Sequence, residues 1–256
     1  MRSATKAVVG ILCSDLHLCH EAPRSRAEKG ADWYVVMHDA LCQVADLRQK
    51  HGCPVFIAGD IFHTWDQPPE LINFAIRHMR LLGMPITIPG QHDLPNHNYK
   101  EKGRSAYWTL LEAGSIYHLE ENERYVIQNI VVYGFAWNKK ITTQPAETKH
   151  RLKLALVHSY VWNGTSTGYT GAPEDKLVNA YREVLRGYDA AAFGDNHIGF
   201  KKELLTGCTL FNCGGFIRRK SDEQHYRPQV GLLMDDGSVE SHYLDVSKEI
   251  GRASCR

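Results

Sequence analysis

Apolar and polar positions follow two different periods along this chain. Short continuous apolar runs, of the length of a buried strand, recur between longer stretches whose apolar positions are spaced three or four residues apart. Four of the runs are followed directly by Gly or His and a fifth by Ser14-Asp15, which is typical of a strand that ends in a functional loop. The central strands predicted in this way are residues 8–13, 54–58, 85–89, 152–157 and 190–193.

Helical patterns lie between these strands, so strand and helix alternate and a layered α/β fold is expected. The predicted helices are residues 32–50, 68–82, 105–113 and 173–186. Shorter β-like pieces are expected at residues 115–119, 125–127, 130–135, 209–213, 230–234 and 242–246. Asp235-Asp236-Gly237 predicts a hairpin turn, because Asp-Gly tolerates positive φ. We expect two mixed β-sheets flanked by helices.

Length and composition set the broad class. The chain of 256 residues is expected to form a single domain over residues 1–250, with residues 251–256 as a disordered or vector-derived tail. No apolar run approaches the roughly eighteen residues of a membrane helix, so no membrane partner is expected. Seven cysteines without a Cys-x-x-Cys pair favour a reducing, cytoplasmic location. A net charge of only +1 means that any surface for nucleic acid must be local.

The strand ends carry side chains that bind metal ions. The ligand-type residues follow the strands within a few positions, and they are Asp15, His17, Asp60, Gln91, His158, Asp195 and His197. Because ligands in α/β sheets bind beyond the carboxyl ends of the strands, these side chains are expected to converge. A set rich in carboxylates and imidazoles, without cysteine, favours catalytic metal over structural metal. Two divalent ions are expected, preferably Mn²⁺, with Mg²⁺, Fe²⁺ or Zn²⁺ as alternatives.

The order of these motifs resembles the calcineurin-like metallophosphoesterases. That family carries Asp-x-His, Gly-Asp, Gly-Asn-His-Asp/Glu, a lone His and Gly-His-x-His, and the resemblance covers residues 9–217. It implies a four-layer sandwich and phosphodiester hydrolysis by a metal-bridging hydroxide. It also implies that Asp15, His17 and His197 hold one ion and that Asp60 bridges the two.

The same resemblance places Gln91, His158 and Asp195 around the second ion and makes His92 the acid near the leaving group. The chain departs from the family pattern at two of these positions. Gln91 stands where Asn is usual, and Asp195 stands where the first His of Gly-His-x-His is usual. Both departures fall on the second ion and make its site more anionic, which favours Mn²⁺ or Mg²⁺.

The segment from Gly59 to Glu70 is similar to the SbcD-type repair nucleases, and this favours a Mn²⁺-dependent DNA exonuclease or endonuclease. In that family a His three residues after the bridging Asp acts in catalysis or DNA handling, which here is His63. A homodimer through Leu71, Phe74 and Leu110 is a further implication, although these residues could equally face their own core. An SMC-like ATPase partner is also implied, but no docking region for it is visible.

Substrate contacts are expected from a late loop and from aromatic residues. Asn212 begins a segment that resembles the family's Asn/Gln-x-Gly-Ser loop, and Arg218 and Arg219 follow it as candidates for phosphate contact. The loops at residues 18–29 and 159–172 are expected to line the site. Four aromatic residues close to ligand positions could stack on a base, namely Trp65, Trp162, Tyr160 and Tyr169.

Two other functions remain open at this point. The same metal core serves small-molecule and nucleotide phosphodiesterases and phosphatases, so the substrate depends on the surrounding loops. The changes at Gln91 and Asp195 also fit a catalytically weakened binding homologue.

Overall fold

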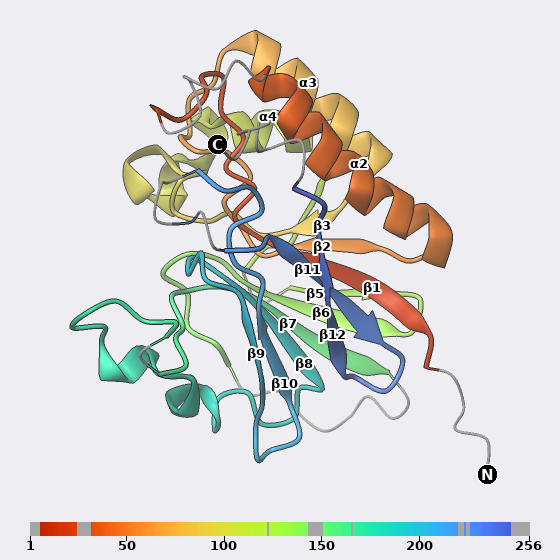
Figure 1. Cartoon of the computed structure of the whole chain (residues 1–256), viewed down its shortest axis with the longest axis vertical. Coiled ribbons are helices and arrows are strands. Elements are labelled where there is room, and N and C mark those ends of the chain that lie inside the picture. Colours follow the sequence, from red (N-terminus) through yellow and green to blue (C-terminus); the bar gives the residue numbers. More distant parts are fainter. Residues whose placement is uncertain are drawn as a thin grey trace, which may run out of the picture.

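The computed structural model describes residues 6–24, 32–121, 123–142, 151–164, 166–219, 223 and 226–246. Two six-stranded mixed sheets pack face to face, with helices over the outer face of the first (Figure 1). This confirms the expected α/β fold with two mixed sheets flanked by helices. The predicted tail at 251–256 and residues 25–29 of the first loop lie outside the described residues.

The first sheet has the strand order β12-β11-β1-β2-β3-β4. Its strands are β1 (Val8–Cys13), β2 (Val55–Ile57), β3 (Ile86–Thr87), β4 (Tyr117–His118), β11 (Gln229–Met234) and β12 (Val239–Tyr243). Strands β1 to β4 run parallel, whereas β11 is antiparallel to β1 and to β12. The predicted turn is confirmed, since Gly237 has φ 84° between β11 and β12.

The second sheet has the order β5-β6-β7-β8-β10-β9. Its strands are β5 (Arg124–Ile127), β6 (Ile130–Phe135), β7 (Leu152–His158), β8 (Ala190–Gly194), β9 (Phe200–Glu203) and β10 (Thr209–Asn212). The four inner strands are parallel, and the edge strands β5 and β9 are antiparallel to their neighbours. The carboxyl ends of β7, β8 and β10 therefore share one edge.

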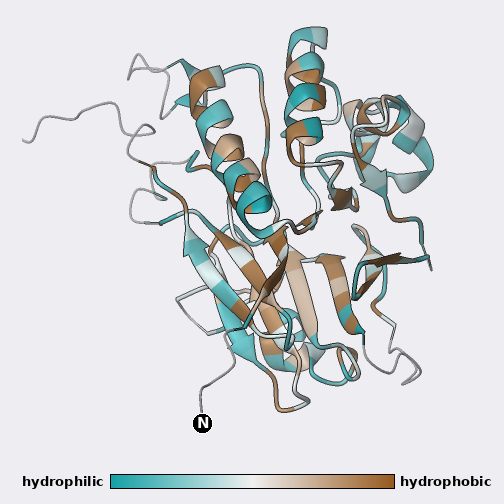
Figure 2. Ribbon diagram, turned by 90° about the vertical axis from the view of Figure 1, so that its right-hand side faces the viewer, coloured by the Kyte–Doolittle hydropathy of each residue, from teal (hydrophilic) through white to brown (hydrophobic). Residues whose placement is uncertain are grey.

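Three helices cover the outer face of the first sheet: α2 (Trp33–His51), α3 (Pro69–Leu81) and α4 (Ala106–Glu112). Helix α2 starts where the Asp32 side chain accepts a hydrogen bond from the Tyr34 amide, and it ends at Gly52 with φ 62°. Brown, apolar positions on the helices alternate with teal, hydrophilic ones (Figure 2). The buried positions of α2 recur every three or four residues, which turns one apolar stripe onto the sheet.

Three apolar clusters hold the layers together. One lies between the helices and the first sheet, and the second lies between the two sheets around Leu12, Phe56, Leu156 and Phe211. The third covers the outer face of the second sheet. Leu71, Phe74 and Leu110 are buried in the first cluster, so these three residues face their own core.

The predicted helix at residues 173–186 is wrong. Two short 3₁₀ segments take its place, η3 (Glu174–Lys176) and η4 (Val178–Tyr181). The Trp162 amide donates to the Lys176 carbonyl, and the Val178 amide donates to the Trp162 carbonyl. This short bridge withdraws two backbone groups that a continuous helix would need. Two smaller differences are that β12 replaces the strand expected at 242–246 and that β9 was not predicted.

Candidate metal centre

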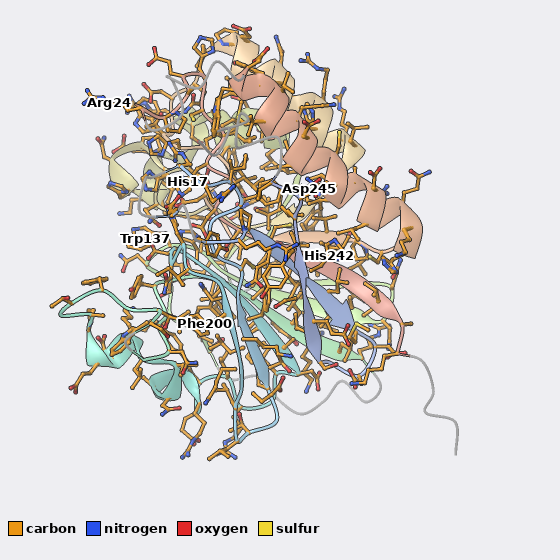
Figure 3. All side chains as sticks on the ribbon, in the orientation of Figure 1. His17, Arg24, Trp137, Phe200, His242 and Asp245 are labelled. Carbon is orange, nitrogen blue, oxygen red and sulfur yellow. The ribbon has the colours of Figure 1, made fainter. Side chains whose placement is uncertain are left out.

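The predicted ligands converge where the carboxyl ends of strands from both sheets meet. Asp15 and His17 follow β1, Asp60 follows β2 and Gln91 follows β3, all in the first sheet. In the second sheet, His158 is the last residue of β7, and Asp195 and His197 follow β8. Figure 3 shows His17 between the helical layer and the strands. In the part of the chain that the structure describes, no helix combines the length and apolar character needed to cross a membrane.

One group of ligands consists of Asp15, His17 and His197. The Nε2 atoms of the two imidazoles are 3.0 Å apart. Oδ1 of Asp15 lies 3.8 Å from Nε2 of His17 and 3.9 Å from Nε2 of His197. Nitrogens bound to one ion at about 2.0–2.1 Å in tetrahedral geometry are roughly 3.4 Å apart, so these three side chains need little movement to share an ion.

Asp60 lies between this group and the second one. Its Oδ2 is 3.7 Å from Nε2 of His17 and 3.4 Å from Nε2 of His158. This oxygen is buried and accepts no hydrogen bond from the described residues, whereas Oδ1 accepts one from the His92 amide at 2.9 Å. A buried carboxylate oxygen without a donor is costly unless a cation satisfies it. Its position between two imidazoles is the one that a bridging ligand requires.

The second group is linked by hydrogen bonds. Gln91 donates from Nε2 to Oδ1 of Asp195 at 2.7 Å, and its Oε1 lies 2.6 Å from Nε2 of His158. A carboxylate only accepts hydrogen bonds, so the contact with Asp195 fixes the orientation of the Gln91 amide. The two residues that depart from the family pattern are therefore direct partners.

His158 is protonated on both nitrogens in this arrangement. Its Nδ1 donates to the carbonyl of Ala58 at 2.6 Å, and its Nε2 faces the amide oxygen of Gln91. Burial lowers the pKa of this imidazole, but Asp60, Asp15 and Asp195 outweigh burial and raise it to about 10. An imidazolium thus supplies the positive charge that a metal ion would supply between the same acids.

Burial and nearby charges also shift the pKa values of the neighbouring ionisable groups. Burial raises the pKa of Asp15 to about 6, although His197 and His158 oppose the shift. Burial also acts to raise the pKa of Asp60, but His158 and His17 overcome it and hold that pKa well below its ordinary value. Burial lowers the pKa of His17, so this side chain is neutral and able to bind a metal.

The backbone at the ligands is strained. Four ligand residues other than glycine have positive φ: Asp15 (51°), His17 (44°), Asp60 (54°) and Asp195 (88°). Such conformations cost energy and persist only where surrounding structure imposes them. Two glycines allow the loops to approach, because a Cβ on Gly59 would lie 2.3 Å from Nδ1 of His158 and one on Gly90 would lie 2.1 Å from Oδ1 of Asp60.

Two acidic residues that were not predicted as site residues support the site. The carboxylate of Asp93 accepts hydrogen bonds from the amides of Ile61, Phe62 and Gly90, which ties the loop after β2 to the loop after β3. Burial and the nearby charge of Asp60 raise the pKa of Asp93 to about 7. Glu223 lies 3.5 Å from Nδ1 of His197 and accepts from the Arg219 amide. Asp93 directly follows His92 in a ligand-bearing motif and could have been predicted from it, whereas Glu223 lies in no such motif.

The two histidines expected in catalysis lie beside the first group. The rings of His63 and His92 are stacked with centroids 5.5 Å apart, and His17 contacts both edgewise. Nδ1 of His92 donates to the His63 carbonyl at 2.7 Å, which leaves its Nε2 as the nitrogen that exchanges a proton. Nη1 of Arg219 donates to Nδ1 of His63 at 2.8 Å, so the proton of neutral His63 is on Nε2.

The expected substrate contacts differ in their surroundings. Asn212 is fully buried, and its amide donates to the carbonyls of Asn196 and Ile198, so it supports the loop that carries His197. Arg218 is also buried. Arg219 is half-buried beside His63 and holds that imidazole by its hydrogen bond.

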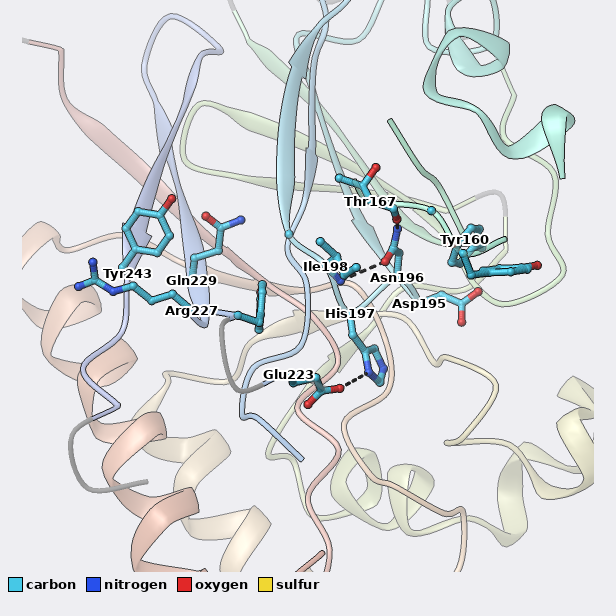
Figure 4. A pocket seen from close by; sticks show the side chains of 14 residues that line it. Tyr160, Thr167, Asp195, Asn196, His197, Ile198, Glu223, Arg227, Gln229 and Tyr243 are labelled. Atoms are coloured by element: carbon cyan, nitrogen blue, oxygen red, sulfur yellow. Dashed lines mark hydrogen bonds and ion pairs between the residues drawn. The ribbon is translucent and has the colours of Figure 1, made fainter. Parts of the chain in front are cut away.

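A pocket of about 730 Å³ opens from the site at Asp195 and His197. Figure 4 shows Arg227, Gln229 and Tyr243 on one side of it and Tyr160 on the other. Two of the four aromatic residues expected to bind a base, Tyr160 and Tyr169, line this pocket. The indole of Trp162 instead donates to the Pro173 carbonyl, and the ring of Trp65 lies under the guanidinium of Arg104.

The donor set fits divalent metal. Three side-chain groups of the described residues place their ligand atoms within 4.8 Å of one another. They are Asp15, His17 and His197; Asp15, Asp60 and His158; and His17, His63 and His92. Carboxylate and amide oxygens together with neutral imidazole suit Mn²⁺, Fe²⁺ or Zn²⁺.

Comparison with known proteins shows the fold. No family model and no curated protein matches the chain. The crystal structure of TT1561 of Thermus thermophilus is similar to it with a TM-score of 0.53 and 11% identity, over 92% of this chain and 98% of that one. A second crystal structure is similar over the same shares, with a TM-score of 0.54 and 12% identity. At these identities the likeness concerns the fold alone.

Proposed function

We propose that this chain is a two-metal-ion phosphodiesterase of the calcineurin-like metallophosphoesterase type and that it cleaves DNA with Mn²⁺. The observation that carries the proposal is Oδ2 of Asp60, a buried oxygen without a hydrogen-bond donor among the described residues that lies between the imidazoles of His17 and His158. In the metal-free protein the imidazolium of His158 faces this oxygen at 3.4 Å and stands where a cation would bind. A carboxylate oxygen between two imidazoles can bridge two cations.

The surrounding side chains would form two ligand sets, one on either side of Asp60. Asp15, His17 and His197 would hold one ion, and Gln91, His158 and Asp195 would hold the other. Two such ions would polarise a phosphoryl oxygen and lower the pKa of water, which is the chemistry of two-metal phosphoesterases.

The histidines next to the ions supply the proton chemistry. Nε2 of His92 is left to carry a proton to the departing oxygen, since its Nδ1 is held by the His63 carbonyl. Burial, followed by the charges of Arg219 and His92, lowers the pKa of His63 to about 4. His63 thus stays neutral near pH 7, and its Nε2 hydrogen is available to a phosphate oxygen.

The test is hydrolysis of bis-p-nitrophenyl phosphate and of labelled DNA by the Mn²⁺-loaded protein. We expect cleavage of both, with loss of both activities in Asp60→Asn. Asp46→Asn is the matched control, because Asp46 is exposed on α2 and is not one of the predicted ligands. Activity of Asp60→Asn equal to wild type would refute the metal mechanism.

The other outcomes distinguish the alternatives. A folded, metal-loaded protein that cleaves the small diester and never DNA would be a small-molecule phosphodiesterase. Binding of one tight Mn²⁺ without hydrolysis of either substrate would identify a weakened binding homologue, and calorimetric metal titration measures that stoichiometry.

A further inference from the structure

The pocket beside Asp195 and His197 is lined by a side-chain amide that can both donate and accept hydrogen bonds. It is the side chain of Gln229, a pocket-lining residue that is 4% exposed. Space is kept for this group, because a Cβ on Gly199 would lie 2.3 Å from Nε2 of Gln229.

Exposed aromatic and aliphatic side chains line the same pocket. Tyr169, Ile198 and Tyr243 are 59%, 43% and 48% exposed, and all three line the pocket. The ring of Tyr160 lies 5.4 Å from that of Tyr169. Large apolar side chains gathered in one concave place mark a binding site, whereas scattered ones do not.

A cation completes the lining. The guanidinium of Arg227 lies 4.7 Å from the centre of the Tyr243 ring, and it forms no salt bridge among the described residues. An Arg stacked on an aromatic ring in this way is suited to a phosphate or to the face of a base. Arg227 and the metal ligands Asp195 and His197 lie along the same pocket, so one extended anion can reach both (Figure 4).

We propose that this pocket binds an unstacked nucleobase of single-stranded nucleic acid next to the phosphodiester that is cleaved. The base stacks on the tyrosines, the Gln229 amide hydrogen-bonds to its edge, and Arg227 contacts the following phosphate. This inference rests on the proposed function for the identity of the substrate. A peptide would satisfy the aromatic surface, but it would not explain an Arg placed in line with a phosphoesterase site.

The test compares two short fluorescent oligonucleotides of equal charge, one oligothymidylate and one abasic throughout. Binding is measured by anisotropy with a chelator present, so that cleavage does not interfere. We expect wild type to bind the base-bearing strand at least about fivefold more tightly than the abasic strand, the lower bound of one base stacked on an aromatic ring. Equal binding of the two strands would overturn the proposal.

The variants assign this preference to the pocket. Tyr169→Ala should remove most of it, whereas Tyr169→Phe, which keeps the ring, should retain it. Arg227→Ala should weaken binding of both strands alike, because it removes a phosphate contact. Arg124→Ala and Val126→Ala are the matched controls, since both residues are exposed on the edge strand β5. A preference for the base that persists in Tyr169→Ala and in Tyr243→Ala would refute the pocket assignment.

A failure here differs from a failure of the proposed function. If the wild type hydrolyses bis-p-nitrophenyl phosphate and DNA but binds both oligonucleotides equally, the proposed phosphodiesterase function stands and the proposed base pocket is refuted. If the wild type prefers the base-bearing strand but hydrolyses neither substrate with Mn²⁺, the base pocket stands and the proposed enzymatic function is refuted.

Discussion

Arg219 donates a hydrogen bond from Nη1 to Nδ1 of His63 at 2.8 Å, across 156 positions of sequence. Because a guanidinium only donates, the bond requires Nδ1 of His63 to be unprotonated. Burial and the charge of Arg219 together lower the pKa of His63 to about 4. An arginine expected to bind phosphate thus sets the protonation of a neighbouring histidine.

Arg219→Met should raise the pKa of His63 toward its ordinary value of about 6.5. With a depressed pKa the unfolded chain binds more protons than the folded chain, so the stability from neutral His63 is lost as pH falls from about 6.5 through about 4. The variant should show a flatter fall in its free energy of unfolding across that window. NMR titration of the His63 ring measures the shift. An unchanged His63 pKa would show that Arg219 does not control it.

Gln91 and Asp195 should behave as a coupled pair. Gln91→Asn shortens the side chain, so it cannot reach His158 and Asp195 together, and we expect the second Mn²⁺ to bind at least about tenfold more weakly. Asp195→His should do the same, and the double variant should regain most of the affinity. Calorimetric titration of Mn²⁺ measures the cycle. Simply additive losses would mean that Gln91 and Asp195 contribute independently to binding of the second ion.

His158 should make metal binding depend on pH. A metal at its Nε2 displaces a proton, because its pKa in the metal-free protein is about 10. Mn²⁺ affinity should rise with pH between about 6 and 8, with proton release seen by calorimetry in two buffers of different ionisation enthalpy. His158→Gln should release less proton per ion bound.

The same histidine should shape the stability of the metal-free protein. A raised pKa means that its stabilisation is complete below about pH 6.5 and is lost as pH rises through about 10. Urea denaturation with a chelator present should therefore give a free energy of unfolding that falls from about pH 7 to about pH 10. An equally steep fall in His158→Gln would assign the effect to other groups.

Asp93→Asn should destabilise the chain by about 3 kcal/mol, because one amide oxygen cannot replace a carboxylate that accepts three backbone hydrogen bonds. Asp236→Asn is the control: Asp236 also accepts a backbone hydrogen bond, but it lies in the exposed turn, where we expect less than about 1 kcal/mol. Urea denaturation compares the two. Similar small losses would mean that Asp93 does not hold the two loops together.

His92→Ala should bind both ions and lose activity. Removal of a general acid typically costs about 10² to 10⁴ in rate. His51→Ala at the end of α2 is the control, and metal stoichiometry should match wild type in both variants. Loss of an ion in His92→Ala would make this residue a ligand and not the acid.

The strand ends could be predicted because each combines an apolar run with a ligand-type residue inside a few positions. This pattern is sufficient to predict Asp15, Asp60 and His158 as site residues, because parallel strands bring their carboxyl ends to one edge of a sheet. The contact between Gln91 and Asp195 could not be predicted, because it joins loops of different sheets 104 positions apart. Glu223 lies in no recognisable sequence motif. Its contact with His197 depends only on the tertiary fold, which brings this segment back to the site.

The wrong helix at 173–186 has a similar physical origin. The segment has a helical spacing of apolar residues, and Val178, Tyr181 and Leu185 are indeed buried against the second sheet. Local pattern therefore predicted which side chains face inward. It could not predict that Trp162, from a preceding loop, occupies the backbone groups of Lys176 and Val178.

The ligands come from both sheets, and their contacts cross the sandwich at one end only. His17 meets His197, Gln91 meets Asp195, and His158 reaches the Ala58 carbonyl. Ions bound here would join the two sheets at their carboxyl ends, whereas apolar side chains form the core between the sheets. Removal of the metal ions would then favour local unfolding at this end of the sandwich. A protease would cleave first in the strands and loops that carry the site.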